Sequence, residues 1–241
     1  MKNKKIDLKI CSINNFKNLL SDERTFCSPK LVSFVNPYSY FLLCERPELL
    51  DVIDELYVDG ALLVKLHNFF NKFNVVERVS FDFSSIANDV FIFANKNIKS
   101  VALVGGSQQE NFLAIQYLSE KYPKINFSLS RDGFFYGDEM NQFIDELATS
   151  GVDIVIAGMG TPLQEEFLVK LKSVSNNKPL LLFTCGGFIS QTAIRGDYYF
   201  PIVKKLGLRW LQRFVLHKHV RQRVLNDYPK FIIRYLACKF N

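Results

Sequence analysis

Asp59 is the residue whose type and surroundings best suit acid–base chemistry. It precedes Gly60 inside the segment LYVDGALLV, which is otherwise apolar. A carboxylate in such a segment is either buried with a partner or placed at the edge of a cleft. At a cleft it could act as a general base and take a proton from an acceptor hydroxyl. The structural alternative is that Asp59 only forms a turn before the glycine.

A second candidate region runs from Gly158 to Glu165 with the sequence GMGTPLQE. We expect a strand to end in its Gly-x-Gly turn and a helix to begin near Pro162. Helix capping by Thr161 and the preference of helix starts for proline and glutamate explain part of this segment. They do not explain two glycines and Gln164 at the end of a strand, which favours a binding role.

Asn36 ends another expected strand, just before Pro37. Its amide could bond a sugar hydroxyl or a base. Alternatively, it could simply form the turn that precedes the proline. The residue type and its position do not separate these two interpretations.

Glycines follow several of the expected strands: Gly105 and Gly106, Gly133 after Asp132, Gly158 and Gly160, and Gly186 and Gly187. Glycine lets backbone N–H groups approach a phosphate, whose charge the N-terminus of the next helix favours. Glycine also simply permits a tight turn, so each of these turns is a weak signal alone. The sequence contains neither GxGxxG nor GxxxxGK[ST], which argues against ordinary dinucleotide or P-loop binding.

No residue pattern predicts a metal site or a cofactor. His217 and His219 are two residues apart and would face different directions on a helix, and the five cysteines are widely scattered. We therefore expect no bound metal and no cofactor. The cysteines are expected to be free thiols in a reducing cytosol.

Alternating strands and helices must position these candidate residues. Short apolar runs predict strands at Leu31–Asn36, Ser100–Val104, Ile125–Leu129, Asp153–Ala157 and Pro179–Cys185. Helical spacing predicts helices at Glu48–Leu56, Ser84–Asn95 (with Ser84 as the N-cap), Gln109–Tyr122, Gly137–Ser150 and Gln164–Ser173. This alternation predicts an α/β fold, a Rossmann-like open parallel sheet with helices on both faces. Ligands of such a sheet bind beyond the carboxyl ends of its strands.

The charge of the chain is divided unevenly between two regions. The 241 residues are 48% hydrophobic and carry a net charge of +6, which excludes a mainly disordered protein. Residues 195–241 hold eleven Lys and Arg against two Asp, a charge of +9, so residues 1–194 sum to −3. We therefore predict a catalytic domain at 1–194 and a short, basic, helical C-terminal appendage at 195–241.

The appendage combines an apolar stripe, with Leu208, Leu211 and Val215, and many basic residues at helical spacing. Such a helix suits an anionic membrane surface, an arginine clamp on a diphosphate, or a nucleic acid. It could equally be a solvated basic face whose apolar side packs on the body. A signal peptide and a membrane span are not expected, which predicts a cytoplasmic protein that is soluble or peripheral at a membrane.

In their order and spacing, these motifs make the sequence similar to the WecG/TagA/CpsF family of bacterial glycosyltransferases (glycosyltransferase family 26). The similarity extends from about Leu31 to about Arg223. It rests on Asn36, Asp59–Gly60, Gly105–Gly106, Tyr122–Pro123, Asp132–Gly133–Phe134, the segment from Gly158 to Glu165, and LGLRWLQR at 206–213.

The resemblance implies an inverting transfer of a sugar from a nucleotide sugar, with a UDP-sugar expected, to a polyprenyl-diphosphate-linked saccharide. Asp59 would be the general base. The residues implied in binding the nucleotide sugar are Asn36, Gly105, Gly106, Asp132, Gly133, Gly158, Gly160, Pro162, Gln164 and Glu165. The appendage would meet the diphosphate through Arg213, Arg221 and Arg223, and would attach the enzyme to the inner face of the cell membrane. A homo-oligomer is also compatible with the sequence.

The sequence departs from the family pattern at Phe34, Phe81, Ser190 and Arg209, where the family has Thr, Gly, Asp and Glu. Two alternatives therefore stay open. One is a non-catalytic α/β protein that binds nucleic acid through the basic appendage. The other is a relative that still binds sugar nucleotides but has lost its activity.

Overall fold

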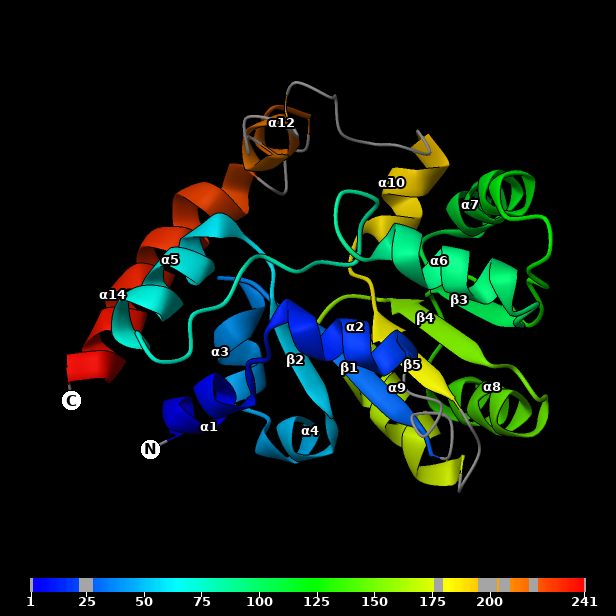
Figure 1. Ribbon diagram of the computed structural model, residues 1–241, viewed down its shortest axis with the longest axis horizontal. Helices are drawn as coiled ribbons and strands as arrows, with labels where there is room; N and C mark the ends of the chain where they lie inside the picture. The colour runs from blue at the N-terminus through cyan, green and yellow to red at the C-terminus, as the bar shows by residue number, and fades with distance from the viewer. Residues whose placement is uncertain are drawn as a thin grey trace.

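A parallel sheet of five strands forms the centre of the protein (Figure 1). The computed structural model describes residues 2–21, 28–175, 180–194, 203, 209–216 and 221–240. The strands are β1 (Lys30–Val35), β2 (Glu55–Val58), β3 (Val101–Gly105), β4 (Ile154–Gly158) and β5 (Leu181–Thr184). They lie in the order β2-β1-β5-β4-β3, and every pair is parallel. This arrangement confirms the predicted Rossmann-like class.

Helices cover both faces of this sheet. The described helices are α1 (Lys2–Lys9), α2 (Ile13–Ser21), α3 (Ser39–Cys44), α4 (Pro47–Val52), α5 (Ala61–Phe70), α6 (Ala87–Lys96), α7 (Gln108–Lys121), α8 (Gly137–Thr149), α9 (Leu163–Val174), α10 (Phe188–Ile194), α12 (Arg209–Leu216), the π-helix η2 (Arg223–Asp227) and α14 (Tyr228–Phe240). One core joins the sheet to α3, α4, α5, α8 and α9, and the other joins it to α2, α6, α7 and α10.

Strand residues supply these two cores alternately. Leu103 and Ile156 face one core, whereas Val104 and Ala157 face the other, and all four side chains are fully buried. This burial on both faces explains why the strands are continuous apolar runs in the sequence.

The helix expected at Glu48–Leu56 is a helix followed by a strand. Helix α4 ends at Val52, the backbone is extended at Ile53, and residues from Glu55 form β2. The spacing of the apolar residues fits a helix, but pairing of β2 with β1 decides the local structure, with Phe34 beside Tyr57. Strand β2 brings Asp59 to the carboxyl edge of the sheet.

The strand expected at Ile125–Leu129 is wrong. The segment makes one isolated bridge, between Asn126 and Ser100, and a second bridge, between Arg131 and Val104, follows it. Side chains replace the regular ladder there, because the backbone N–H of Leu103 donates to Ser130 Oγ (2.9 Å). The side chain of Asn111 donates to the carbonyl oxygens at positions 103 and 131.

The connection from β2 to β3 crosses the whole sheet, because these two strands are its opposite edges. The chain leaves β2, forms α5, and then runs through residues 71–86 to α6 on the other side (Figure 1). The expected N-cap Ser84 lies within this crossing segment, and Ile86 occupies the N-cap position of α6 instead. The segment also carries Arg78, Ser80 and Asp82 past the carboxyl ends of the strands.

The end of the predicted appendage packs on the body. Helix α14 lies beside α5 (Figure 1), and its Phe231 and Tyr235 side chains are 3% and 1% exposed. The Tyr235 ring lies 5.4 Å from that of Tyr40 in α3, and Lys239 forms an ion pair with the buried carboxylate of Asp7 in α1.

The predicted domain boundary lies between residues 194 and 195. Residues 195–202 are outside the described part of the chain. The division into two domains therefore stays a prediction. Within the described parts of the chain, no helix is long and apolar enough to cross a membrane.

Candidate active site

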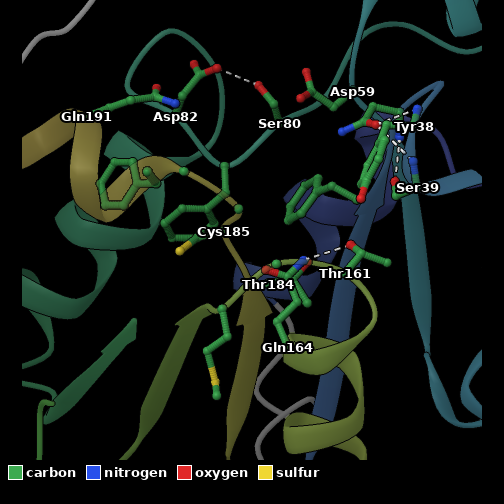
Figure 2. A pocket seen from close by; sticks show the side chains of 18 of the residues that line it. Tyr38, Ser39, Asp59, Ser80, Asp82, Thr161, Gln164, Thr184, Cys185 and Gln191 are labelled. Carbon is green, nitrogen blue, oxygen red and sulfur yellow. Dashed lines mark hydrogen bonds between the residues drawn. The ribbon is translucent and has the colours of Figure 1, made fainter. Parts of the chain in front are cut away.

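A cavity of about 480 Å³ opens at the carboxyl ends of β1, β2, β4 and β5. Figure 2 shows most of the side chains that line it. They include the predicted residues Asn36, Asp59, Gly160 and Gln164, together with Phe34, Tyr38, Ser39, Ser80, Phe81, Asp82, Met159, Thr161, Leu163, Thr184, Cys185, Gly186, Gly187, Phe188 and Gln191. The cavity is therefore where the fold predicts a ligand site.

Asp59 stands at the end of β2, beside the end of β1. The register of these strands pairs Val35 with Val58, and the backbone N–H of Asp59 donates to the Val35 carbonyl (2.7 Å). The Asp59 side chain is 21% exposed and reaches the cavity. It is thus neither a fully buried structural carboxylate nor a fully solvated turn residue.

Arg78 bridges two carboxylates at this cavity. Its Nε donates to Asp59 Oδ1 (3.0 Å), and its Nη2 donates to Asp82 Oδ2 (2.7 Å). Its Nη2 also lies 3.0 Å from the same oxygen of Asp59, Oδ1. The guanidinium is planar, so it fixes the direction of the Asp59 carboxylate relative to the crossing segment.

Asp82 anchors Arg78 and the loop around it. Its carboxylate accepts hydrogen bonds from Ser80 Oγ (2.7 Å), from the backbone N–H of Ser84 (2.8 Å) and from the Ser84 hydroxyl. Burial alone would raise the pKa of Asp82, but the positive charge of Arg78 and these hydrogen bonds outweigh burial and lower it. The ionised Asp82 therefore holds the Arg78 guanidinium within hydrogen-bond distance of Asp59.

Asn36 forms the turn that its position before Pro37 suggests. Its Oδ1 accepts the backbone N–H groups of Tyr38 (2.9 Å) and Ser39 (3.1 Å) at the start of α3. These hydrogen bonds use the amide oxygen and leave the Nδ2 group as the part of Asn36 suited to contact a ligand. The turn and the binding interpretation are therefore compatible.

Gln164 and Glu165 belong to a buried polar network at the start of α9. Oε1 of the fully buried Glu165 accepts hydrogen bonds from Ser33 Oγ (3.0 Å), Thr161 Oγ1 (3.2 Å) and Gln164 Nε2 (3.1 Å). Burial raises the pKa of Glu165 despite these hydrogen bonds. Among the described residues, neither Gln164 Oε1 nor Glu165 Oε2 has a hydrogen-bond partner. Thr161 and Gln164 line the cavity, whereas Glu165 and Pro162 do not.

Two departures from the family pattern contact each other. The rings of Phe34 and Phe81 have centroids 6.4 Å apart, and both residues line the cavity. Phe34 also stacks on Tyr57 at 5.9 Å, and Phe81 packs against Phe183 at 5.5 Å. At position 34, an aromatic surface formed by Phe34 and Phe81 thus replaces the polar contact expected of the family's threonine. We call this surface the Phe34–Phe81 wall.

The glycine turns divide into two groups. Gly160, Gly186 and Gly187 line the cavity, whereas the other predicted residues do not: Gly105, Gly106, Asp132, Gly133 and Gly158. A Cβ at Gly105 would lie 2.4 Å from the carbonyl oxygen of Gly158, and one at Gly158 would lie 2.7 Å from that of Gly186. Close backbone packing is therefore sufficient to require glycine at these two positions, and their role in binding stays a prediction.

The predicted arginines lie in the C-terminal segment. Arg221 is exposed in the helical turn before η2. Arg213 belongs to α12 and Arg223 to η2, but their side chains lie outside the described part of the structure. Contact of these three arginines with a diphosphate stays a prediction.

Sequence reasoning missed Ser80, Asp82 and the role of Arg78. Arg78 and Asp82 are opposite charges four residues apart in RVSFDFSS, in a stretch without a clear helix or strand pattern. That signal becomes useful only once the crossing of this segment over the sheet is known. In the described ranges, no group of three or more His, Cys, Asp or Glu side chains could hold a metal ion.

Comparison with known proteins adds to this geometry. A family model described as "Glycosyl transferase WecG/TagA/CpsF family" matches residues 5–241. The chain is also 43% identical over 207 residues to the UDP-Gal:alpha-D-GlcNAc-diphosphoundecaprenol beta-1,4-galactosyltransferase of Shigella boydii. That alignment covers 86% of this chain and 86% of the relative.

Proposed function

The chain belongs to the WecG/TagA/CpsF family of glycosyltransferases, and from this premise we propose that it transfers galactose from UDP-galactose to a GlcNAc unit linked to a polyprenyl diphosphate. The observation that carries the proposal is the cavity at the carboxyl edge of the sheet, which Asp59 lines and where Arg78 donates a hydrogen bond to Asp59. The named substrates of the 43% identical relative supply the donor and acceptor.

The transfer requires a base that deprotonates the acceptor hydroxyl and a displacement at the anomeric carbon of the donor sugar. We propose that the Asp59 carboxylate, which Arg78 holds through Oδ1, accepts the proton of the acceptor hydroxyl. The hydroxyl oxygen then bonds to the anomeric carbon while the bond from that carbon to the phosphate breaks. UDP leaves with the bonding electron pair, and the configuration at the anomeric carbon inverts. Arg78 orients the carboxylate for this transfer.

Donor binding is assigned to the opposite part of the cavity. Gly160, Gly186 and Gly187 bring backbone close to the cavity, and Thr161, Gln164 and Gln191 supply hydrogen-bonding side chains. The Phe34–Phe81 wall offers an apolar surface for the face of a sugar or a base. Asn36 lies beside Asp59, where the two sugars meet, and contacts a sugar hydroxyl through Nδ2.

The acceptor brings a diphosphate and a lipid to the same site. The strongly basic segment 195–241 suits both the diphosphate and an anionic membrane surface, whereas the body of the protein has a charge of −3. We therefore assign Arg213, Arg221 and Arg223 to the diphosphate, with action at the cytoplasmic face of the membrane. A homo-oligomer is compatible with this arrangement.

A sugar-transfer assay tests the function. The purified protein is incubated with a polyprenyl-diphosphate-GlcNAc acceptor and, separately, radiolabelled UDP-galactose, UDP-glucose and UDP-GlcNAc. We expect label in the lipid product from UDP-galactose, and at least tenfold less from the other two. Tight, salt-dependent duplex DNA binding without transfer would favour the nucleic-acid alternative. A thermal shift with UDP-galactose without transfer would favour the inactive relative.

A further inference from the structure

A second groove shares one lining residue with the active-site cavity. It has a volume of about 220 Å³ and lies between α3 and α14. Tyr38 lines both the groove and the cavity, so the two spaces adjoin at this residue. Nothing in the proposed chemistry of the cavity uses this groove.

The lining of the groove is mainly apolar, with charges at its rim. The rings of Phe41 and Phe231 lie 5.6 Å apart, and Pro37 and the half-buried Leu42 complete the apolar surface. Four charged residues share the rim: Glu45, Asp227, Lys230 and Arg234. Arg234 pairs with Glu45 at 2.8 Å and lies over the Phe41 ring at 4.1 Å.

The groove lies on the acceptor side of the cavity. In Figure 2, Tyr38 and Asp59 lie toward one side of the cavity, and Cys185 and Gln191 toward the other. Strand register places Asn36 next to Asp59, and a Cβ at Gly60 would lie 3.6 Å from Pro37. A hydroxyl that donates to Asp59 therefore belongs to a molecule bound near residues 36–38.

We propose that the groove between α3 and α14 binds the part of the acceptor's lipid chain nearest to its diphosphate. This inference rests on the proposed function, since it requires a lipid-linked acceptor whose sugar reaches Asp59. An amphiphile of this kind presents a sugar, then an anionic group, then a hydrocarbon chain. The cavity offers a surface for the sugar, Lys230 and Arg234 offer positive charge for the anionic group, and the apolar lining of the groove suits the hydrocarbon. Burial of hydrocarbon against the exposed Tyr38 ring and the half-buried Leu42, over the buried rings of Phe41 and Phe231, provides the binding free energy.

The test compares two acceptors on one variant. Leu42→Asp places a carboxylate in the groove at a half-buried position, which the fold should tolerate. The matched control is Phe112→Asp, at an exposed apolar side chain on α7. Each protein is assayed with GlcNAc diphosphate carried on a long polyprenyl chain, and with the same head group on a short alkyl chain.

We expect Leu42→Asp to raise the KM for the long-chain acceptor about tenfold or more. Its kcat/KM for the short-chain acceptor and its KM for UDP-galactose should stay within about twofold of the wild type. Equal loss with both acceptors, or no loss with either, would overturn the groove assignment. If the wild type transfers to neither acceptor, the proposed function itself fails, which is a different outcome.

A labelling experiment on the wild type gives a second, independent readout. An acceptor with a photoreactive diazirine in its first isoprene unit is bound, irradiated and mapped by mass spectrometry. Labels within residues 37–42 and 227–234 are expected. Labels confined to other segments would contradict the proposal even if Leu42→Asp fails to fold.

Discussion

The two halves of the carboxyl edge of the sheet contain different kinds of residue. At β1 and β2 the edge presents polar side chains, namely Asn36 and Asp59, with Arg78 brought in by the crossing segment. At β3 and its neighbouring loop it presents Gly105, Gly106 and Gly133: a Cβ at Gly133 would lie 3.1 Å from Gly105 Cα, and the backbone N–H of Gly133 donates to the Gly106 carbonyl (2.9 Å). The cavity covers the first half and extends over the ends of β4 and β5, but it does not include these three glycines.

A glycine at the end of a strand can therefore be there for two reasons: close packing of the fold, or access of the backbone to a ligand. Gly105 has a φ of +138° and no room for a Cβ, so the fold itself requires glycine there. Gly160 has a φ of +83° with open space around it and lies at the cavity. Strand-end glycines are therefore a sign of a site only where polar side chains gather beside them.

Asp59→Asn should have the largest effect on turnover. The amide cannot accept the acceptor's proton, so we expect kcat to fall about 10²-fold or more with little change in the melting temperature. The matched control is Asp138→Asn on the exposed first turn of α8. Near-normal turnover of Asp59→Asn would remove Asp59 from the role of base.

Gly105→Ala should act through stability instead. The new Cβ meets the Gly158 backbone, and the positive φ is strained for alanine, so unfolding should become easier by about 2 kcal/mol or more. The control is Gly151→Ala, where φ is +77° and a Cβ would meet no other atom; it should lower the free energy of unfolding by about 1 kcal/mol. Thermal or urea unfolding measures both. A variant that keeps its stability but loses donor binding would place the ligand on this half.

Arg78→Met should affect both activity and stability. Without the guanidinium, Asp59 loses its orientation and Asp82 becomes a buried carboxylate without its cation, so we expect kcat to fall about tenfold. The double variant Arg78→Met/Asp82→Asn should recover stability but not kcat. Recovery of both would show that Arg78 serves only the fold.

Glu165→Gln should change the pH dependence of stability. Because the pKa of Glu165 is raised in the folded protein, its stabilising contribution is complete below its usual value near 4.5. The contribution is lost as the pH rises through the folded pKa, with a slope of at most about 1.4 kcal/mol per pH unit. The variant should therefore gain stability relative to the wild type as the pH rises above about 4.5. Parallel unfolding curves across this range would contradict the raised pKa.

Much of the fold was predictable because its strands are continuous apolar runs. The α/β class and four of the five strands follow from that pattern. Strand β2 was missed because its spacing also fits a helix, and the Ile125–Leu129 strand was wrong because Ser130 and Asn111 replace ladder hydrogen bonds. Such choices depend on tertiary pairing, which a periodicity in one segment does not contain.

The site was predictable where its residues directly follow strands. Asn36 and Asp59 directly follow β1 and β2, Gly160 lies two residues after β4, and Gln164 lies in the first turn of the helix that comes next; the cavity contains all four. Arg78, Ser80 and Asp82 reach the cavity through a long crossing segment, whose path depends on the strand order. Local sequence could not reveal them as neighbours of Asp59 for this reason.

The central claim is that the polar half of the carboxyl edge performs the transfer. A crystal structure with UDP-galactose and a short-chain acceptor tests it most directly. We predict that the anomeric carbon of galactose lies in the cavity, between Asp59 and the glycines at 186–187, with the acceptor hydroxyl at the Asp59 carboxylate. An anomeric carbon over Gly105, Gly106 and Gly133, with Asp59 in contact with neither substrate, would contradict this account.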